Sequence, residues 1–165
     1  MTDEPVIAPA PTIPENRITP NVSGSLPEAE VERITADLAD LLAGTRLSCT
    51  VVVHANHAAE LDAQVAAALH RLRQSAAILL NQAVLLAGVN DSEEALRALS
   101  ERLVDLGVVP YYLHLLDRVR GAAHFEVPEP RALAMHRRLR ETLPGYAVPR
   151  LAREMPGEPA KVWLG

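Results

Sequence analysis

Lys161 is the residue with the most specific chemical potential, because it is the only lysine among the 165 residues. The other basic side chains are all arginine. Chemistry that needs a side-chain primary amine, such as formation of a Schiff base, therefore has one candidate in this chain. A genome that favours arginine codons over lysine codons accounts for the same count without any function. Taken by itself, that explanation is the simpler one.

Polar side chains also occur at the end of, or directly after, three short apolar segments that are predicted to be strands. In parallel α/β folds, active sites gather at the carboxyl ends of the strands. Polarity at three consecutive strand ends exceeds what a scaffold alone requires, so we expect a ligand to bind there. The residues concerned are His54, Asn56 and His57 after the first segment, Asn81 and Gln82 in the second, and Tyr111, Tyr112, His114 and Asp117 in and after the third.

Some of these side chains have a structural explanation as well. Asn56 or His57 could cap the helix that follows. The two histidines at 54 and 57 do not indicate a zinc site, because no supporting cysteine or second histidine pair accompanies them. Residues 81–82 lie in a buried apolar run and need hydrogen-bond partners, so structural and functional explanations stay equally open.

The third segment carries the same ambiguity. Asp117 could cap a turn at the end of its strand. Tyr111 and Tyr112 are expected to pack, one on each side of the sheet, because successive side chains of a strand alternate.

The elements that would position these residues follow from two alternating periodicities. Amphipathic helical patterns alternate with apolar β-branched runs, which predicts an α/β fold with a parallel sheet and about three βα units. Such units could form a small three-layer domain or part of a (β/α) barrel. The chain is expected to begin with a Pro-rich irregular arm at 1–24 and to end with an irregular tail at 146–165. The expected strands are 50–53, 77–82 and 108–116. The expected helices are 25–44, with a capping box of Ser25 and Glu28, 58–73, a third that starts at the cap of Asp91 and Glu94 and ends at Gly107, and 130–143.

Composition excludes several classes of function. The net charge is −5 and the chain has only five aromatic residues, which does not suit a nucleic-acid-binding protein. No run of 18 apolar residues exists, and the acidic N-terminus lacks the apolar segment of a secretory signal. We therefore expect a cytoplasmic protein. The single cysteine, Cys49, excludes an internal disulfide and any metal cluster that needs several cysteines of this chain.

Four sequence blocks stand out: VVHANHAAELD at 52–62, LLNQAVLLAGVND at 79–91, PYYLHLLDRVRGAAHF at 110–125 and GYAVPRLAREMPGEPAK at 145–161. They resemble the C-terminal half of the lysine 2,3-aminomutase family, closest to its branch that serves β-lysylation of elongation factor P. This resemblance covers about residues 44–161, and the blocks follow the order of the family. In addition, IPENRITP at 13–20 is similar to a segment that precedes them in the family.

The resemblance implies a radical S-adenosylmethionine enzyme with a partial (β/α) barrel, of which residues 25–145 would be the C-terminal part and 146–165 the tail that carries the coenzyme lysine. Family members hold a [4Fe-4S] cluster in a CxxxCxxC loop and use pyridoxal phosphate as a second cofactor. They move the amino group of lysine from carbon 2 to carbon 3. In the elongation factor P branch, the resulting (R)-β-lysine is destined for that factor.

The resemblance also assigns roles to individual residues. Lys161 matches the lysine that binds pyridoxal phosphate, so the only lysine stands where the family requires one. Asp117 and Glu154 match acidic contacts to the substrate, although the family carries aspartate where Glu154 stands. The remaining matches are His57 and Gln82 to contacts of S-adenosylmethionine, and Tyr112 to a position near the pyridoxal ring.

Two departures from the family pattern qualify this expectation. The CxxxCxxC motif needs three cysteines and the chain has one, so the sequence offers no ligands for the cluster. The end of the chain reads AKVWLG where the family continues with a Thr-Pro-Leu sequence. The chain is therefore expected to be either part of an aminomutase completed by another chain, or an inactive remnant that at most binds pyridoxal phosphate or lysine. Strand edges left unpaired in a partial barrel would favour self-association or a partner chain.

Overall fold

The structure, a computed structural model, describes residues 28–117, 121–155, 157 and 159–165. The predicted arm at 1–24 and the predicted cap at Ser25 lie outside these residues. The described ranges form four α-helices and a five-stranded sheet, which confirms the α/β class. The elements are α1 (Glu28–Gly44), β1 (Thr50–Val53), η1 (Ala58–Glu60), α2 (Ala63–Gln74), β2 (Ile78–Leu85), α3 (Glu93–Asp105), β3 (Val109–Leu115), η2 (Ala123–Phe125), α4 (Glu129–Thr142), η3 (Gly145–Ala147), β4 (Arg150–Arg153) and β5 (Val162–Trp163).

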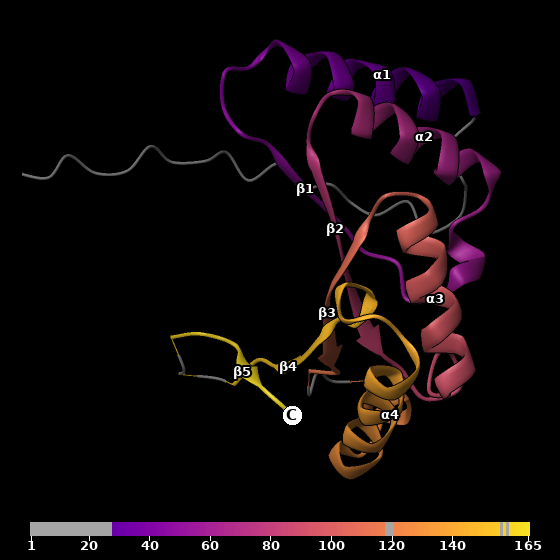
Figure 1. Cartoon of the computed structure of the whole chain (residues 1–165), viewed down its shortest axis with the longest axis vertical. Coiled ribbons are helices and arrows are strands. Elements are labelled where there is room, and N and C mark those ends of the chain that lie inside the picture. Colours follow the sequence, from indigo (N-terminus) through magenta and orange to yellow (C-terminus); the bar gives the residue numbers. More distant parts are fainter. Residues whose placement is uncertain (1–27, 118–120, 156, 158) are drawn as a thin grey trace, which may run out of the picture.

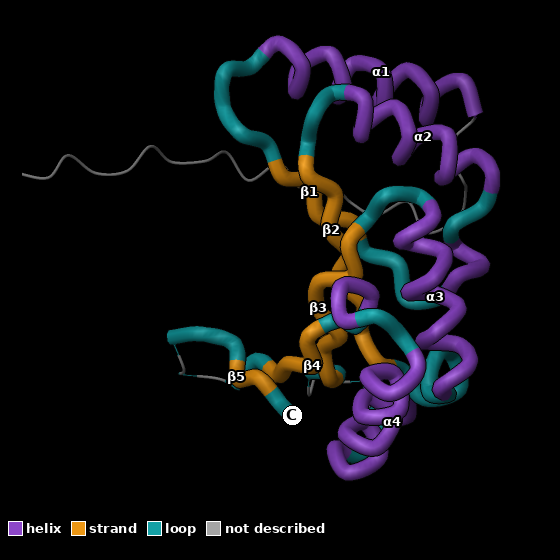
Figure 2. Tube along the Cα trace, in the orientation of Figure 1, coloured by secondary structure: helices purple, strands orange, loops and turns teal. Residues whose placement is uncertain are grey.

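The strands follow one another across the sheet in chain order, β1-β2-β3-β4-β5. The first four are parallel, whereas β5 pairs antiparallel with β4, so the sheet is mixed and not wholly parallel as expected. The four α-helices lie on one side of the sheet (Figure 1), and none of the described α-helices lies on the other side (Figure 2). Sequential parallel strands with helices on one face are the arrangement of a (β/α) barrel segment. The described sheet is open, so the barrel stays a prediction.

Burial along β2 separates the two faces of the sheet. Its odd-numbered residues from Leu79 to Leu85 are buried under the helices, and its even-numbered residues face the other way and are less buried. The helix-covered face packs against Leu103 of α3 and Leu139 of α4. We call the opposite face the open face. The pairing of strands places two rows of residues on it: Gln82, Tyr112 and Arg150 in one, and Val84, His114, Ala152 and Trp163 in the next.

The helix predicted at 58–73 is divided into two pieces. Residues 58–60 form the short η1, and α2 begins only at Ala63. Asp62 caps α2, because its carboxylate accepts a hydrogen bond of 2.9 Å from the backbone N–H of Val65. An acceptor side chain at this position satisfies one of the free N–H groups of the first helical turn, which fixes the start of the helix there.

The start of α3 also differs from the prediction by one residue. Ser92, not Asp91, is the cap, and its hydroxyl oxygen accepts a hydrogen bond of 3.1 Å from the N–H of Ala95. The carboxylate of Asp91 instead accepts a hydrogen bond from the N–H of Gly88 and forms an ion pair of 2.8 Å with Arg131. It therefore stabilises the turn before the helix.

Two predictions about strands are wrong. The continuous apolar, β-branched run at 50–53 predicts a buried strand, but Val52 is 41% exposed, because β1 is the edge of the described sheet and Val52, which pairs with Leu80, lies on the open face. The tail at 146–165 was expected to be irregular, but it contains β4 and β5. The sequence Arg-Leu-Ala-Arg of β4 is too short and too charged to give an apolar run. Only its pairing with β3, which buries Leu151 and Ala152, makes it a strand.

Three asparagine side chains join the carboxyl ends of β1 and β2. Asn81 is buried and exchanges two hydrogen bonds with the backbone of Ala55, while Asn56 accepts one of 2.7 Å from the N–H of Val84. The fully buried Asn90 accepts from the N–H of Leu86 and donates to the carbonyl oxygens of residues 56 and 84. We call Asn56, Asn81 and Asn90 the asparagine cluster. It satisfies backbone groups that the strands leave unpaired where they end.

Replacing Asn90 by aspartate should lower the free energy of unfolding by about 3 kcal/mol, because two buried carbonyl oxygens lose their donor and face a negative charge instead. The measurement is urea unfolding of the full chain, followed by circular dichroism. Gln74→Glu makes the same change of group at an exposed position and should cost less than about 1 kcal/mol. Equal losses for the two variants would contradict a stabilising role of Asn90.

Candidate functional site

Lys161 lies immediately before β5, on the segment that returns from β4 to the open face. Its Nζ atom is 2.5 Å from Oε1 of Glu154 and 5.4 Å from the centre of the Tyr112 ring. The side chain of Lys161 is 31% exposed and that of Glu154 is 56% exposed. The only lysine of the chain is therefore held over the sheet by a carboxylate, with an aromatic ring beneath it.

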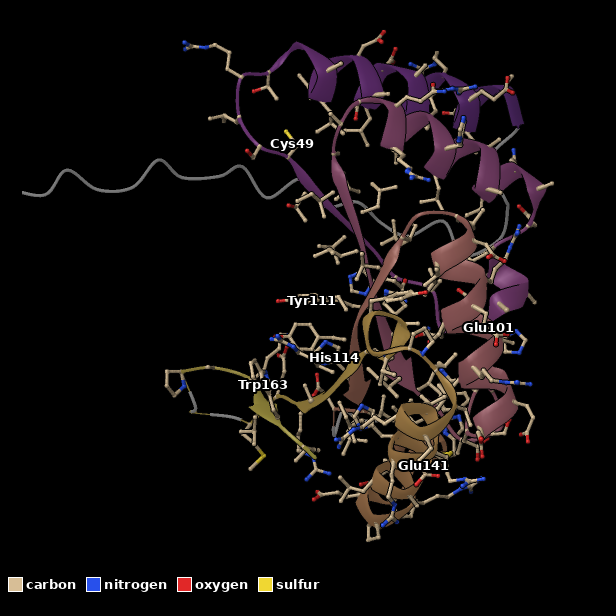
Figure 3. The ribbon with its side chains drawn as sticks, in the orientation of Figure 1. Cys49, Glu101, Tyr111, His114, Glu141 and Trp163 are labelled. Carbon is tan, nitrogen blue, oxygen red and sulfur yellow. The ribbon has the colours of Figure 1, made fainter. Side chains whose placement is uncertain are left out.

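Four aromatic side chains lie on this side of the sheet, and we call them the aromatic cluster: Tyr111, Tyr112, His114 and Trp163. The ring of Tyr112 is buried, with its centre 4.2 Å from that of Tyr111 and 5.3 Å from that of His114. Trp163 completes the cluster from β5, with the guanidinium carbon of Arg150 4.4 Å from its ring centre. Figure 3 shows Tyr111, His114 and Trp163 on the side of the sheet away from the helices that carry Glu101 and Glu141.

Contact between Tyr111 and Tyr112 corrects the expectation that they lie on opposite sides of the sheet. Asn81 pairs with Pro110 but Gln82 pairs with Tyr112, so Tyr111 is an extra residue in β3. Such a β-bulge interrupts the alternation of side chains along a strand. The bulge therefore brings the two tyrosine rings together.

The charges around His114 show which groups share its surroundings. Burial is the main cause that lowers the pKa of the His114 imidazole, and the positive charge of Lys161 lowers this pKa further. The carboxylates of Glu154 and Asp117 act in the opposite direction. Since the ordinary pKa of histidine is about 6.5, the ring is neutral at neutral pH. The structure thus brings Lys161, Glu154 and Asp117 within electrostatic reach of one neutral imidazole.

Hydrogen bonds within the site also shift two acidic groups. The hydrogen bond from Lys161 holds the pKa of the Glu154 carboxyl below its ordinary value. The pKa of the Tyr112 hydroxyl is lowered chiefly by a hydrogen bond with Tyr111, and hydrogen bonds with Trp163 and Arg150 contribute to the same direction. Both groups are therefore stabilised in the form that accepts hydrogen bonds.

His57 lies on the loop after β1 and caps η1. Its Nδ1 accepts a hydrogen bond of 3.1 Å from the N–H of Ala59, and the Glu60 carboxylate accepts from the backbone N–H groups of Asn56 and His57. This arrangement is a capping box. The capping explanation is thus confirmed for His57, and Nε2 is the ring nitrogen that the cap does not use. Asn56 does not cap, because its side chain binds Val84.

The predicted site residues divide into two groups in space. The charges of Lys161, Glu154 and Asp117 all act on His114, and Tyr112 lies beneath Lys161. Gln82 is half-buried on the open face, beside Tyr112 in the register of β2 and β3. His57 belongs to the loop that the asparagine cluster attaches to β2. The functional roles of all six stay predictions.

Two side chains of this site were not expected from the sequence: Arg150 and Trp163. Both residues lie in the tail that we predicted to be irregular. The face of the sheet on which a residue lies can be assigned only once its strand is known. The signal available was the spacing of Trp163, two residues after Lys161, which places both on one side of an extended chain.

The residues present fit pyridoxal phosphate but not an iron–sulfur cluster. An amine on the open face, beside aromatic rings and a neutral imidazole, suits a planar coenzyme with an aldehyde. Cys49 precedes β1, and its thiol is 3.6 Å from the carbonyl oxygen of Leu47. Figure 3 shows it far from Trp163. In the described ranges, no three His, Cys, Asp or Glu side chains form a group that could hold a metal ion.

None of the helices in the described part of the chain has the length and apolarity needed to cross a membrane. No protein-family model matches the chain.

Curated proteins named L-lysine 2,3-aminomutase are similar to most of the chain. The Haemophilus influenzae protein is 46% identical over 136 residues, which cover 82% of this chain and 40% of that protein. The Escherichia coli protein is 46% identical over 143 residues, covering 87% and 42%. The Clostridium subterminale protein is 31% identical over 156 residues, covering 94% and 37%. The chain spans about two fifths of the length of these relatives. By its sequence, the chain belongs to the L-lysine 2,3-aminomutase family.

Proposed function

We propose that the open face binds pyridoxal phosphate and lysine as part of an L-lysine 2,3-aminomutase, an isomerase that converts L-lysine to (R)-β-lysine. The observation that carries this proposal is the place of Lys161, the only lysine, beside Glu154 and above the Tyr112 ring. Its side chain is the one non-terminal primary amine available for covalent attachment of the coenzyme.

When bound, pyridoxal phosphate supplies an aldehyde that bonds to amines and a ring system that delocalises electrons. The protein's contribution is to place the groups around it. Tyr112 lies below the Lys161 amine, and its neighbours lower the pKa of its hydroxyl. The neutral ring of His114 lies beside Tyr112 and can accept or donate a proton within the reach of Lys161.

Glu154 is proposed to bind the side-chain ammonium group of the substrate, with Asp117 as a second carboxylate. The ion pair with Lys161 supports this role, because the side chain of Lys161 is chemically identical to that of substrate lysine. Glu154 thus already accepts an alkylammonium group at 2.5 Å. If Lys161 held the coenzyme, its amine would no longer occupy Glu154, and this carboxylate could accept a second ammonium group.

Radical chemistry requires groups that these residues do not supply. We propose that the cysteine ligands of the iron–sulfur cluster come from residues other than these 165, in the same polypeptide or in a partner chain. We also propose that His57 and Gln82 contact S-adenosylmethionine. The proposal that the (R)-β-lysine product serves to modify elongation factor P rests on the similarity of the four sequence blocks. The alternative is a chain that binds pyridoxal phosphate or lysine without turnover.

The first test of this function is covalent labelling of Lys161. Condensation of its amine with the aldehyde of pyridoxal phosphate releases water, and borohydride then supplies the hydride that makes the bond irreversible. Peptide mapping after this treatment should find a pyridoxyl group on Lys161. In Lys161→Arg the label at this peptide should disappear, while circular dichroism stays unchanged. Label confined to the α-amino group of Met1 in the unmodified chain would overturn the assignment of Lys161.

The second test measures the pKa of Glu154 by NMR titration. Because Lys161 depresses this pKa, the ion pair is present above it and is lost as the pH falls through it. In Lys161→Met, the pKa should rise towards its ordinary value near 4.5. Added L-lysine should lower it again, whereas L-norleucine, which lacks the side-chain ammonium, should not. Glu141, which pairs with Arg138, is the internal control. Equal effects of the two amino acids would argue against substrate binding by Glu154.

The third test concerns the cluster. Anaerobic reconstitution of this chain with iron and sulfide should leave no stoichiometric [4Fe-4S] centre, because one cysteine cannot supply three thiolate ligands. Absorbance near 400 nm and iron analysis measure the outcome. A stoichiometric cluster together with conversion of lysine to β-lysine by the pure chain would contradict the proposal that the cluster ligands come from residues other than these 165.

A further inference from the structure

Lys161 stands on a segment that the backbone alone supports weakly. The strand β5 after it has two residues, paired with Ala152 and Arg153, and one further backbone hydrogen bond of 2.9 Å joins Leu164 to Leu151. The described residues between β4 and Lys161 are exposed. Two-stranded pairs this short have little stability in water without side-chain packing. Some other contact must therefore fix the position of the lysine.

The ion pair of Lys161 with Glu154 is not sufficient for this purpose. The Glu154 side chain is 56% exposed, and exposed ion pairs contribute little to stability because water and salt screen them. Glu154 is also part of the same returning segment, so a bond between these two residues does not attach the segment to the sheet.

Trp163 provides the missing attachment. Its ring lies against the guanidinium group of Arg150, with 4.4 Å from the guanidinium carbon to the ring centre. Arg150 belongs to β4 and pairs in register with Tyr112 of β3. The Trp163 and Arg150 side chains also contribute to lowering the pKa of the Tyr112 hydroxyl. The end of the chain is thereby attached to β4, beside Tyr112 of β3.

Because side chains of an extended chain alternate between its two sides, fixing Trp163 also fixes the side on which Lys161 lies. Residues 161 and 163 lie on the same side of the chain, over the open face, because they are two apart. Leu164 faces the opposite way and packs against the core. With Trp163 fixed on one face and Leu164 on the other, the backbone before them has one orientation. That orientation holds Nζ of Lys161 5.4 Å from the Tyr112 ring centre.

We propose that Trp163 and Arg150 are positioning residues that hold Lys161 over the open face, because the Trp163 ring lies against the Arg150 guanidinium group in the strand beside Tyr112. The inference rests on the proposed function, because it matters for catalysis only if Lys161 carries the coenzyme. Its physical content, the fixed position of the amine, holds without any coenzyme.

Competitive acetylation tests this position directly. A trace of acetic anhydride labels Lys161 and the α-amino group of Met1, which serves as an internal reference within the same chain. In Trp163→Ala, the reactivity of Lys161 relative to this reference should rise about fivefold, the factor that corresponds to loss of one exposed cation–π contact. Val162→Ala changes an exposed side chain of the same strand and should leave the ratio unchanged.

Conservative variants separate positioning from general loss of structure. Trp163→Phe keeps a ring for the guanidinium group and should restore most of the protection. Arg150→Met should raise the reactivity of Lys161 as Trp163→Ala does, and the double variant should rise no further, because both changes remove one contact. In Arg150→Met, the fluorescence of Trp163, the only tryptophan, also reports whether its ring leaves the sheet. This measurement stands even if Trp163→Ala does not fold.

The outcomes distinguish this inference from the proposed function. Increased reactivity of Lys161 in Trp163→Ala, with no pyridoxyl label in the unmodified chain, would support the positioning role and overturn the coenzyme assignment. Unchanged reactivity in both Trp163→Ala and Arg150→Met would overturn the positioning role, whatever pyridoxal phosphate does. Borohydride labelling of the variants at a constant coenzyme concentration then shows whether a displaced amine is also labelled less.

Discussion

The asparagine cluster is the constraint on which the described site depends. A strand that ends leaves backbone N–H and C=O groups without ladder partners, and at the carboxyl ends of β1 and β2 these groups are buried. Asn81 and Asn90 satisfy them with hydrogen bonds of 2.7–3.1 Å, and both side chains are at most 2% exposed. Apolar residues of the same volume could not do this. The loop that carries His57 therefore has a fixed place beside β2.

The one-sided arrangement of the helices determines where chemistry can take place. The odd-numbered residues of β2 face the core under α3, so any side chain that meets a ligand must come from the even-numbered set or from the strand ends. Gln82 and the aromatic cluster are on that face. The bulge at Tyr111 adds a ring to it that regular alternation would have placed among the helices. A single inserted residue thus enlarges the aromatic surface beside Lys161 and shifts the pairing of β3 with β2 by one residue from Gln82 onward.

The sequence predicted those parts of the structure that depend on local periodicity. The helices and first three strands follow from apolar spacing, although caps at Asp62 and Ser92 moved two helix starts. β4 could not be predicted, since its four residues form a strand only through pairing with β3. For the same reason Arg150 and Trp163 were missed, whereas Lys161 and Glu154 were identified from type, count and resemblance. Residues whose role follows from chemistry are visible in a sequence, and residues whose role follows from long-range pairing are not.

The end of the chain shows how a departure from the family sequence is accommodated. A Thr-Pro-Leu sequence after the lysine would offer proline, which cannot donate to a strand ladder. Here Val162 and Trp163 pair with β4, the Trp163 ring lies against Arg150 and Leu164 packs against the core. The tail is thus held by contacts of its own residues with β4, which in turn pairs with β3. Substitutions in these two strands can therefore displace Lys161 without touching it, and its position is a property of the sheet as much as of the tail.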